Sequence, residues 1–295
     1  MAKKKNLIKE KSPIFVITAI ALSFAVILYI ILFYWGFITS LKKQNEFRVN
    51  NFGLPQYWAW ENFSKVLSQF FVPVYVPGGI KKVGILEMAY NTIVYSLGGA
   101  FSVVTVQFMV AYVTSKYDSF FNKILVNGII LISLLPTVGG GAATMKLMHN
   151  LGLLDNRYYI LVTNLSMISY QTLFFRGFFS GISKEYMDAA RIDGAGELTI
   201  FTRVMLPMSY KVYTTYIFLT FMGLYNDYMG PLLYMKSYPV LAYAVFSLST
   251  RQQEGFTTVP IRLASAFLLA IPISLLFIAI QKKIIIVVDA GGLKE

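Results

Sequence analysis

Residues 185–207 read EYMDAARIDGAGELTIFTRVMLP, and this polar, charged stretch lies between long apolar segments of the chain. One of those segments, residues 14–40, runs for 27 positions without an Asp, Glu, Lys or Arg. A helix needs about 20 consecutive apolar residues to cross about 30 Å of hydrocarbon, and a helix pairs its backbone amides where there is no water. The chain is therefore predicted to be an all-α, polytopic transmembrane protein in which residues 185–207 form a loop at the membrane face.

The composition supports a membrane protein and narrows its chemistry. Of the 295 residues, 56% are hydrophobic and 14% charged, whereas soluble domains are typically about 25% charged. The mean hydropathy is +0.60. The formal net charge of +12 comes without a cluster of basic and aromatic residues, so contact with anionic lipid is expected, not with nucleic acid. The chain has no cysteine, which excludes disulfides, thiolate metal sites and thiol catalysis.

Hydropathy predicts six membrane spans, and the charges beside them predict the orientation. An even number of spans places both termini, the 116–123 loop and the 181–211 loop on one side, where more than half of the 26 Lys and Arg residues lie. Because positive charge favours the cytoplasmic side, both termini are predicted to be cytoplasmic. The predicted spans are residues 14–40, 88–115, 124–145, 158–180, 212–234 and 261–281.

These spans divide the chain into five predicted segments. Inside the third span, Gly139, Gly140 and Gly141 follow Pro136 and predict a break in the helix. The segments are a cytoplasmic N-terminal tail at 1–13, the first transmembrane helix at 14–40, an extracellular loop at 41–87, a transmembrane core at 88–281 that includes the 181–211 cytoplasmic loop, and a cytoplasmic C-terminal tail at 282–295.

The stretch at 185–207 has the local signals of a short helix. Ser183 can cap it, Glu185 suits the positive end of the helix dipole, and Gly194 can end it. A helix of about ten residues is roughly 15 Å long, so it would lie across the membrane face instead of crossing it. Pro207 is expected to prevent a helix from continuing upstream without a kink, and so to set the angle into the fifth span.

The surface of this short helix suits a protein partner. Ala189 and Ala190 keep the surface narrow, so that the cleft of another protein can grip it closely. Asp188, Arg191 and Asp193 offer charged contacts that could fix its orientation.

The spacing within the loop resembles a known motif. Asp188-Ala189-Ala190 is followed by three residues and Gly194, and then by nine more residues and Val204-x-Leu206-Pro207. This pattern resembles the EAA loop of membrane subunits of binding-protein-dependent ABC importers, and the wording AARIDGA is similar to the sugar branch. Asp188 stands where the family usually has Glu, and Val204 where it usually has Ile. The resemblance implies coupling to an ATPase subunit through Glu185, Asp188, Ala189, Ala190, Arg191, Asp193, Gly194 and Pro207.

The resemblance also implies a fold, a function and partners. The fold is the six-span core of a type I ABC importer permease, and the function is to move a sugar, in particular an oligosaccharide, across the cytoplasmic membrane of a prokaryote. The implied partners are a second permease subunit in a heterodimer, two cytoplasmic ATPase subunits that bind ATP and Mg, and an extracellular binding protein. The chain has no nucleotide or catalytic motif and no metal-ligand cluster around its one histidine, so it is expected to be a transport subunit without a cofactor or metal of its own.

Asn226 and Asp227, near the far end of the fifth predicted span, are candidates for the substrate path. A carboxylate near an apolar run is costly in lipid and tends to face a cavity, and an amide can both donate to and accept from a sugar hydroxyl. Asp227 can equally reach interfacial water or pair with a neighbour. Two other functions stay open: an ABC importer for a non-sugar solute, and an ion-driven carrier, which would need acidic or histidine relays that the spans nearly lack apart from Asp227.

Overall fold

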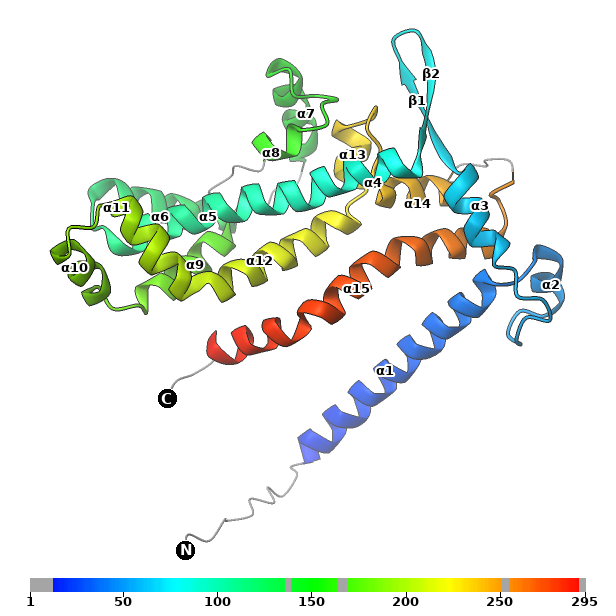
Figure 1. Cartoon of the computed structure of the whole chain (residues 1–295), viewed down its shortest axis with the longest axis horizontal. Coiled ribbons are helices and arrows are strands. Elements are labelled where there is room, and N and C mark those ends of the chain that lie inside the picture. The colour runs from blue at the N-terminus through cyan, green and yellow to red at the C-terminus, as the bar shows by residue number, and fades with distance from the viewer. Residues whose placement is uncertain (1–12, 136–138, 164–168, 251–254, 292–295) are drawn as a thin grey trace, which may run out of the picture. The chain divides into compact units, whose positions relative to one another are not determined.

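The structure, a computed structural model, describes residues 13–135, 139–163, 169–250 and 255–291 (Figure 1). Most of these residues are helical, and two strands form a hairpin. Nearly all of the predicted N-terminal tail, the end of the predicted C-terminal tail and Pro136 lie outside the described residues.

Two compact units divide the chain: residues 1–67 with 252–268, and residues 68–251 with 269–295. The elements are α1 (Pro13–Ser40), α2 (Gln44–Val49), α3 (Glu61–Gln69), β1 (Phe71–Val76), β2 (Gly79–Gly84), α4 (Ile85–Ile93), the π turn η1 (Val94–Gly98), α5 (Gly99–Lys116), α6 (Phe120–Leu134), α7 (Gly140–Asn150), α8 (Tyr159–Thr163), α9 (Tyr170–Ser180), α10 (Glu185–Ile192), α11 (Glu197–Ile200), the π turn η2 (Phe201–Met205), α12 (Leu206–Asn226), α13 (Met229–Tyr234), α14 (Leu241–Thr250) and α15 (Val259–Gly291).

In the first unit, α1 is an apolar helix that packs mainly near its C-terminal end. Its N-terminal part is exposed on all sides, as expected for a helix that crosses a membrane. Near the C-terminal end of α1, the Phe267 ring packs against Gly36. A Cβ at this position would lie 3.4 Å from the ring, so the glycine allows the close contact. The Asn62 amide donates hydrogen bonds to the carbonyls of Ser40 and Lys42, at 2.8 and 2.9 Å, which ties α3 to the end of α1.

The second unit is built on a long helical rod, in which α4, η1 and α5 continue one another. α5 lies beside α9 and α12 (Figure 1). Phe108 of α5 is 1% exposed, and the centroid of its ring lies 5.3 Å from that of Phe175, 4.8 Å from that of Phe179 and 4.8 Å from that of Tyr213. These rings join the three helices at the end of the unit that carries α10 and α11.

The all-α prediction is wrong at residues 71–84, where β1 and β2 pair as an antiparallel hairpin. Val72 and Val74 alternate with more exposed residues and are 1% and 5% exposed, as expected for a half-buried strand. Gly78 and Gly79 turn the chain with φ of +103° and +143°, which other residues rarely adopt. The alternation and the glycine pair are the signals of a hairpin that the six-span prediction overlooked.

In the part of the chain that the structure describes, three helices are long and apolar enough to cross a bilayer: Pro13–Ser40, Ile85–Lys116 and Val259–Ala279. They coincide with the predicted first, second and sixth spans. The other three predicted spans are each divided between two helices: α6 and α7, α8 and α9, and α12 and α13, of which α12 has 21 residues. The predicted break in the third span is confirmed. α6 ends before Gly139, and Gly139 has a φ of +84° directly before the first residue of α7. Within the described residues, the structure thus supports a mostly helical membrane protein with three candidate spans.

Candidate functional site

The predicted short helix is α10, and its first turn follows the sequence signals. The Glu185 N–H donates a hydrogen bond to Ser183 Oγ at 3.3 Å, although Lys184, at the N-cap position, makes no side-chain cap. Glu185 and Asp188 place carboxylates in the first turn, where the helix dipole favours negative charge. The helix has 8 residues, fewer than the ten that the sequence predicted.

Gly194 ends α10 in the manner predicted for it. Its φ is +81°, a left-handed conformation that glycine adopts without a steric penalty. The Gly194 N–H donates to the Arg191 carbonyl at 3.0 Å, and the Ala195 N–H donates to the Ala190 carbonyl at 2.9 Å. These two bonds form a Schellman motif, which pairs carbonyls that the end of the helix would otherwise leave free.

The inner face of α10 packs on the buried end of the second unit. Met187 is 2% exposed and belongs to a buried apolar group, here named the inner cluster. Ala190 is partly buried against the same cluster, whereas Ala189 is exposed. A force on α10 therefore acts on side chains of α5, α9 and α12. The buried members of the inner cluster are Val104, Phe108, Ala111, Tyr112, Phe175, Phe179, Met187, Ile200, Met205 and Val212.

The outer face of α10 is linked to α11 by Arg191. Its guanidinium lies 3.1 Å from an Asp188 oxygen and 3.0 Å from a Glu197 oxygen. Glu197 also accepts a hydrogen bond from the Tyr117 hydroxyl, which lies just beyond the end of α5. Arg191 thus links α10 to α11 within the chain, and both Arg191 and Asp193 are exposed. The sequence prediction missed Glu197 and Tyr117. The available signal for Glu197 was its acidic side chain six positions after Arg191, beyond two glycines that turn the chain.

These contacts shift the pKa values of two groups. The hydrogen bond from Tyr117, assisted by Arg191, lowers the pKa of Glu197 in spite of a desolvation that opposes it. Burial, reinforced by the bond to Glu197, raises the pKa of Tyr117. At neutral pH Glu197 is therefore a carboxylate that accepts hydrogen bonds and Tyr117 a neutral donor, so the link between α5, α10 and α11 is intact.

Large apolar side chains stand exposed on the same loop. Tyr186 is 53%, Ile192 87% and Leu198 73% exposed. Apolar side chains gathered on an otherwise polar loop are typical of a contact surface for another protein. The sequence prediction named the charged and small residues of this loop and missed these three.

The helix that contains Pro207 continues from upstream, with a π turn directly before α12. α11, η2 and α12 follow one another directly, and Pro207 is the second residue of α12. Proline lacks an N–H and crowds the carbonyl four residues earlier, which ordinarily kinks an α-helix. Here the wider π turn at Phe201–Met205 comes directly before it, and such a turn accommodates a change in hydrogen-bond register. The helix of the predicted fifth span therefore starts at Glu197, well before Pro207.

Asn226 and Asp227 lie at the other end of α12. One Asp227 carboxylate oxygen accepts from the Tyr95 hydroxyl at 2.5 Å, and the other accepts from the backbone N–H groups of Met229 and Gly230 at 2.9 and 3.1 Å. Asp227 thus pairs with neighbours, which is the alternative that the sequence left open. The Asn226 side chain is exposed, and its Nδ2 donates to a carbonyl of its own helix at 2.9 Å.

Comparison with known proteins assigns this architecture to a family. The family described as the binding-protein-dependent transport system inner membrane component matches residues 11–285. The chain belongs to this family. As a member, it is a transport subunit located in a membrane and not an enzyme.

Relatives within the family cover nearly the whole chain. The maltodextrin transport system permease protein MdxG of Bacillus subtilis (strain 168) is 27% identical over 277 residues, which is 92% of this chain and 94% of that protein. The melibiose/raffinose/stachyose import permease protein MelC of the same organism is 23% identical over 264 residues, 89% and 90% of the two chains. A solved bacterial ABC transporter involved in the import of the acidic polysaccharide alginate contains a chain with the same fold, with a TM-score of 0.76, 20% identity and coverage of 93% and 97%.

Proposed function

We propose that this chain is a permease subunit of an ABC importer that moves a sugar, in particular an oligosaccharide, across the cytoplasmic membrane. The observation that carries the proposal is that relatives similar over 92% and 89% of the chain are permeases named for maltodextrin and for melibiose, raffinose and stachyose. The solved structure of similar fold is named for a polysaccharide importer. These names favour a carbohydrate over the non-sugar solutes that the sequence left open.

The proposed assembly joins this chain to a second permease subunit, two cytoplasmic ATPase subunits and an extracellular binding protein. ATP and Mg bind to the ATPase subunits, because the sequence has no nucleotide motif of its own. In this arrangement the chain has six spans and both termini in the cytoplasm of a prokaryote. The 41–87 segment then faces the binding protein outside.

In the proposed cycle, α10 transmits the motion of the ATPase. The exposed Tyr186, Ile192 and Leu198 enter a cleft of the ATPase subunit, and Met187 and Ala190 press on the inner cluster. The pair between Arg191 and Glu197 keeps α10 from turning freely against α11, so a displacement of α10 reaches α5, α9 and α12. Alternating access follows, because the outward-open and inward-open states bind the closed and open ATPase differently.

At the other end of α12, we propose that Asn226 contributes to the sugar path. Its side chain is exposed, and its amide oxygen can accept a hydrogen bond from a sugar hydroxyl. Asp227 would act as a positioning residue, since three donors already occupy its carboxylate.

The coupling role is tested in proteoliposomes that contain the assembled importer. Replacing Ile192 with Ser should abolish most ATP-driven uptake and most stimulation of ATPase activity by substrate, with an unchanged thermal unfolding midpoint, because Ile192 is 87% exposed. Ala190→Trp should lose both activities and also lower the midpoint. Leu147→Ser, which changes an exposed apolar residue of α7, is the matched control. Normal uptake and stimulation in both loop variants would exclude the coupling role.

The cargo is tested by competition in the same proteoliposomes. Uptake of labelled maltodextrin should require ATP on the side of the membrane where the ATPase subunits lie. Other oligosaccharides should inhibit this uptake, whereas peptide or phosphate should not. Competition by peptide or phosphate alone would support an importer for a non-sugar solute. Uptake driven by an ion gradient in the absence of ATP would support an ion-driven carrier.

A further inference from the structure

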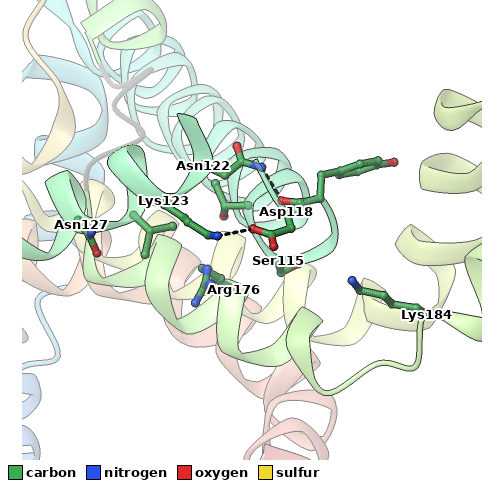
Figure 2. Close-up of a pocket in the computed structure, with 10 residues that line it drawn as sticks. Ser115, Asp118, Asn122, Lys123, Asn127, Arg176 and Lys184 are labelled. Carbon is green, nitrogen blue, oxygen red and sulfur yellow. Dashed lines mark hydrogen bonds and ion pairs between the residues drawn. The ribbon is translucent and has the colours of Figure 1, made fainter. Parts of the chain in front are cut away.

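A cavity of about 420 Å³ lies beside the start of α10 (Figure 2). Its walls come from the end of α5, the following turn, α6, α9 and the residue that precedes α10. The proposed coupling mechanism uses none of its charged side chains. The residues that line the cavity are Thr114, Ser115, Tyr117, Asp118, Asn122, Lys123, Val126, Asn127, Arg176 and Lys184.

The cavity has an excess of positive charge. Lys123, Arg176 and Lys184 contribute three cations and Asp118 one anion, which leaves a formal charge of +2 (3 − 1 = 2). Lys123 and Asp118 form an ion pair at 3.1 Å. Among the described residues, Arg176 and Lys184 have no ion pair of their own, and Figure 2 shows Arg176 beside the Lys123–Asp118 pair and Lys184 on the opposite side.

Among these charged groups, Arg176 has a buried donor atom without a partner in the described part of the chain. It lies on α9, which carries part of the predicted fourth span, and the residue is only partly exposed. Its Nε is shielded from solvent and has no hydrogen-bond partner within the described part of the chain. A buried donor of this kind costs free energy unless it is paired, and a guanidinium pairs best with a phosphate or carboxylate through two parallel bonds.

An apolar surface adjoins the charged cavity. Phe120, Phe121 and Ile124 of α6 are 73%, 80% and 53% exposed, and they surround Lys123 in the first turns of the helix. A free anion would bury none of this apolar surface, whereas the acyl chains of a lipid would pack on it and be stabilised by its burial. Basic pockets between transmembrane helices bind anionic lipid headgroups in this way.

We propose that this cavity binds the phosphodiester headgroup of an anionic phospholipid, which Arg176 and Lys184 contact directly. Lys184 immediately precedes the first residue of α10, so the bound headgroup holds the start of the coupling loop against the membrane. This lipid site goes beyond the proposed sugar import, and binding to it is measured without substrate or ATPase.

The test is native mass spectrometry of the full chain in detergent, with phosphatidylglycerol, phosphatidylcholine or inorganic phosphate added. Phosphatidylglycerol should bind more tightly than phosphatidylcholine. Because each cation near a phosphate contributes about a five-fold change in affinity, K184Q and R176Q should each weaken phosphatidylglycerol binding by about that factor. D118N removes the opposing charge and should tighten binding by a similar factor, whereas K146Q, at an exposed lysine of α7, should leave it unchanged.

Each opposite result overturns the proposal. Equal binding of both lipids would exclude recognition of charge. Displacement of the lipid by inorganic phosphate at equal concentration would show a free-anion site. K184Q lies at an exposed position, so unchanged binding in a folded K184Q protein would exclude the cavity even if R176Q fails to fold.

Discussion

The two ends of α12 are held in different ways (Figure 1). At the end near α10, the polar links are exposed: Arg191 pairs with Glu197, six positions away, and Glu197 also accepts from Tyr117. At the other end, the bond between Tyr95 and Asp227 joins residues 132 positions apart and is partly buried. Exposed polar contacts leave the loop freer to move, whereas the far end, where three donors hold the Asp227 carboxylate, should resist movement. The four predictions below test this contrast, from the largest expected effect to the smallest.

Met187→Ala should have the largest effect, because it removes the buried anchor of α10. Truncation of a buried Met to Ala typically costs about 2–5 kcal/mol, part of it from the cavity that is left. The thermal unfolding midpoint should fall, and ATP-driven uptake should be lost. Met208→Ala, at a 44% exposed position of α12, is the control. Equal effects of the two variants would show that α10 does not depend on burial.

Gly230→Ala should disturb the far end of α12. The added Cβ would lie 2.3 Å from the Tyr95 hydroxyl oxygen and 2.6 Å from an Asp227 oxygen, so both side chains or the backbone must move. Such overpacking costs about 1–3 kcal/mol of unfolding free energy, measured by denaturant titration in detergent.

Gly223→Ala, within α12 and with open space around it, is the matched control and should stabilise the helix by up to about 1 kcal/mol. If Gly230→Ala is equally well tolerated, the bond between Tyr95 and Asp227 does not restrain this end.

Gly194→Val should loosen the end of α10. Its φ of +81° is unfavourable for a residue with a Cβ by about 1–2 kcal/mol, so the Schellman motif should open. Hydrogen exchange at the Ala195 amide should accelerate while exchange near Tyr95 stays unchanged. Gly196→Val, at φ of −73° in the same loop, should leave Ala195 protected. Acceleration at both ends of α12 would contradict the separation of the two regions.

Acidification should have the smallest effect. The pKa of Glu197 is lower in the folded chain than in the unfolded chain, so its contribution is complete above the ordinary value of 4.5 and is lost as pH falls through the lowered value. The side chain is 56% exposed, so solvent screening limits this contribution to about 1 kcal/mol or less.

The measurement is the difference in unfolding midpoint between the parent and Glu197→Gln as a function of pH. The difference should be present at neutral pH and vanish in acid. A difference that grows in acid would have the wrong sign and would exclude the link.

The sequence predicted the parts of the loop that depend on neighbouring residues. Ser183 and Gly194 act within a few positions, so their roles can be read from local spacing. The contact between Tyr117 and Glu197 spans 80 positions, and its partners meet only because α5 and α12 pack side by side. The exposed Ile192 was missed for a different reason, since an apolar residue in a helix gives no local sign that it faces outward.

The hairpin of β1 and β2 has a consequence for how copies of this protein meet in a crowded membrane. A two-stranded sheet has two unpaired edges, and such edges can recruit a strand from another molecule. Pro73 removes one backbone donor from β1, and Lys81 and Lys82 place two like charges on β2. An incoming strand from a second copy would meet the same missing donor and the same charges, so the hairpin resists strand addition and aggregation between copies.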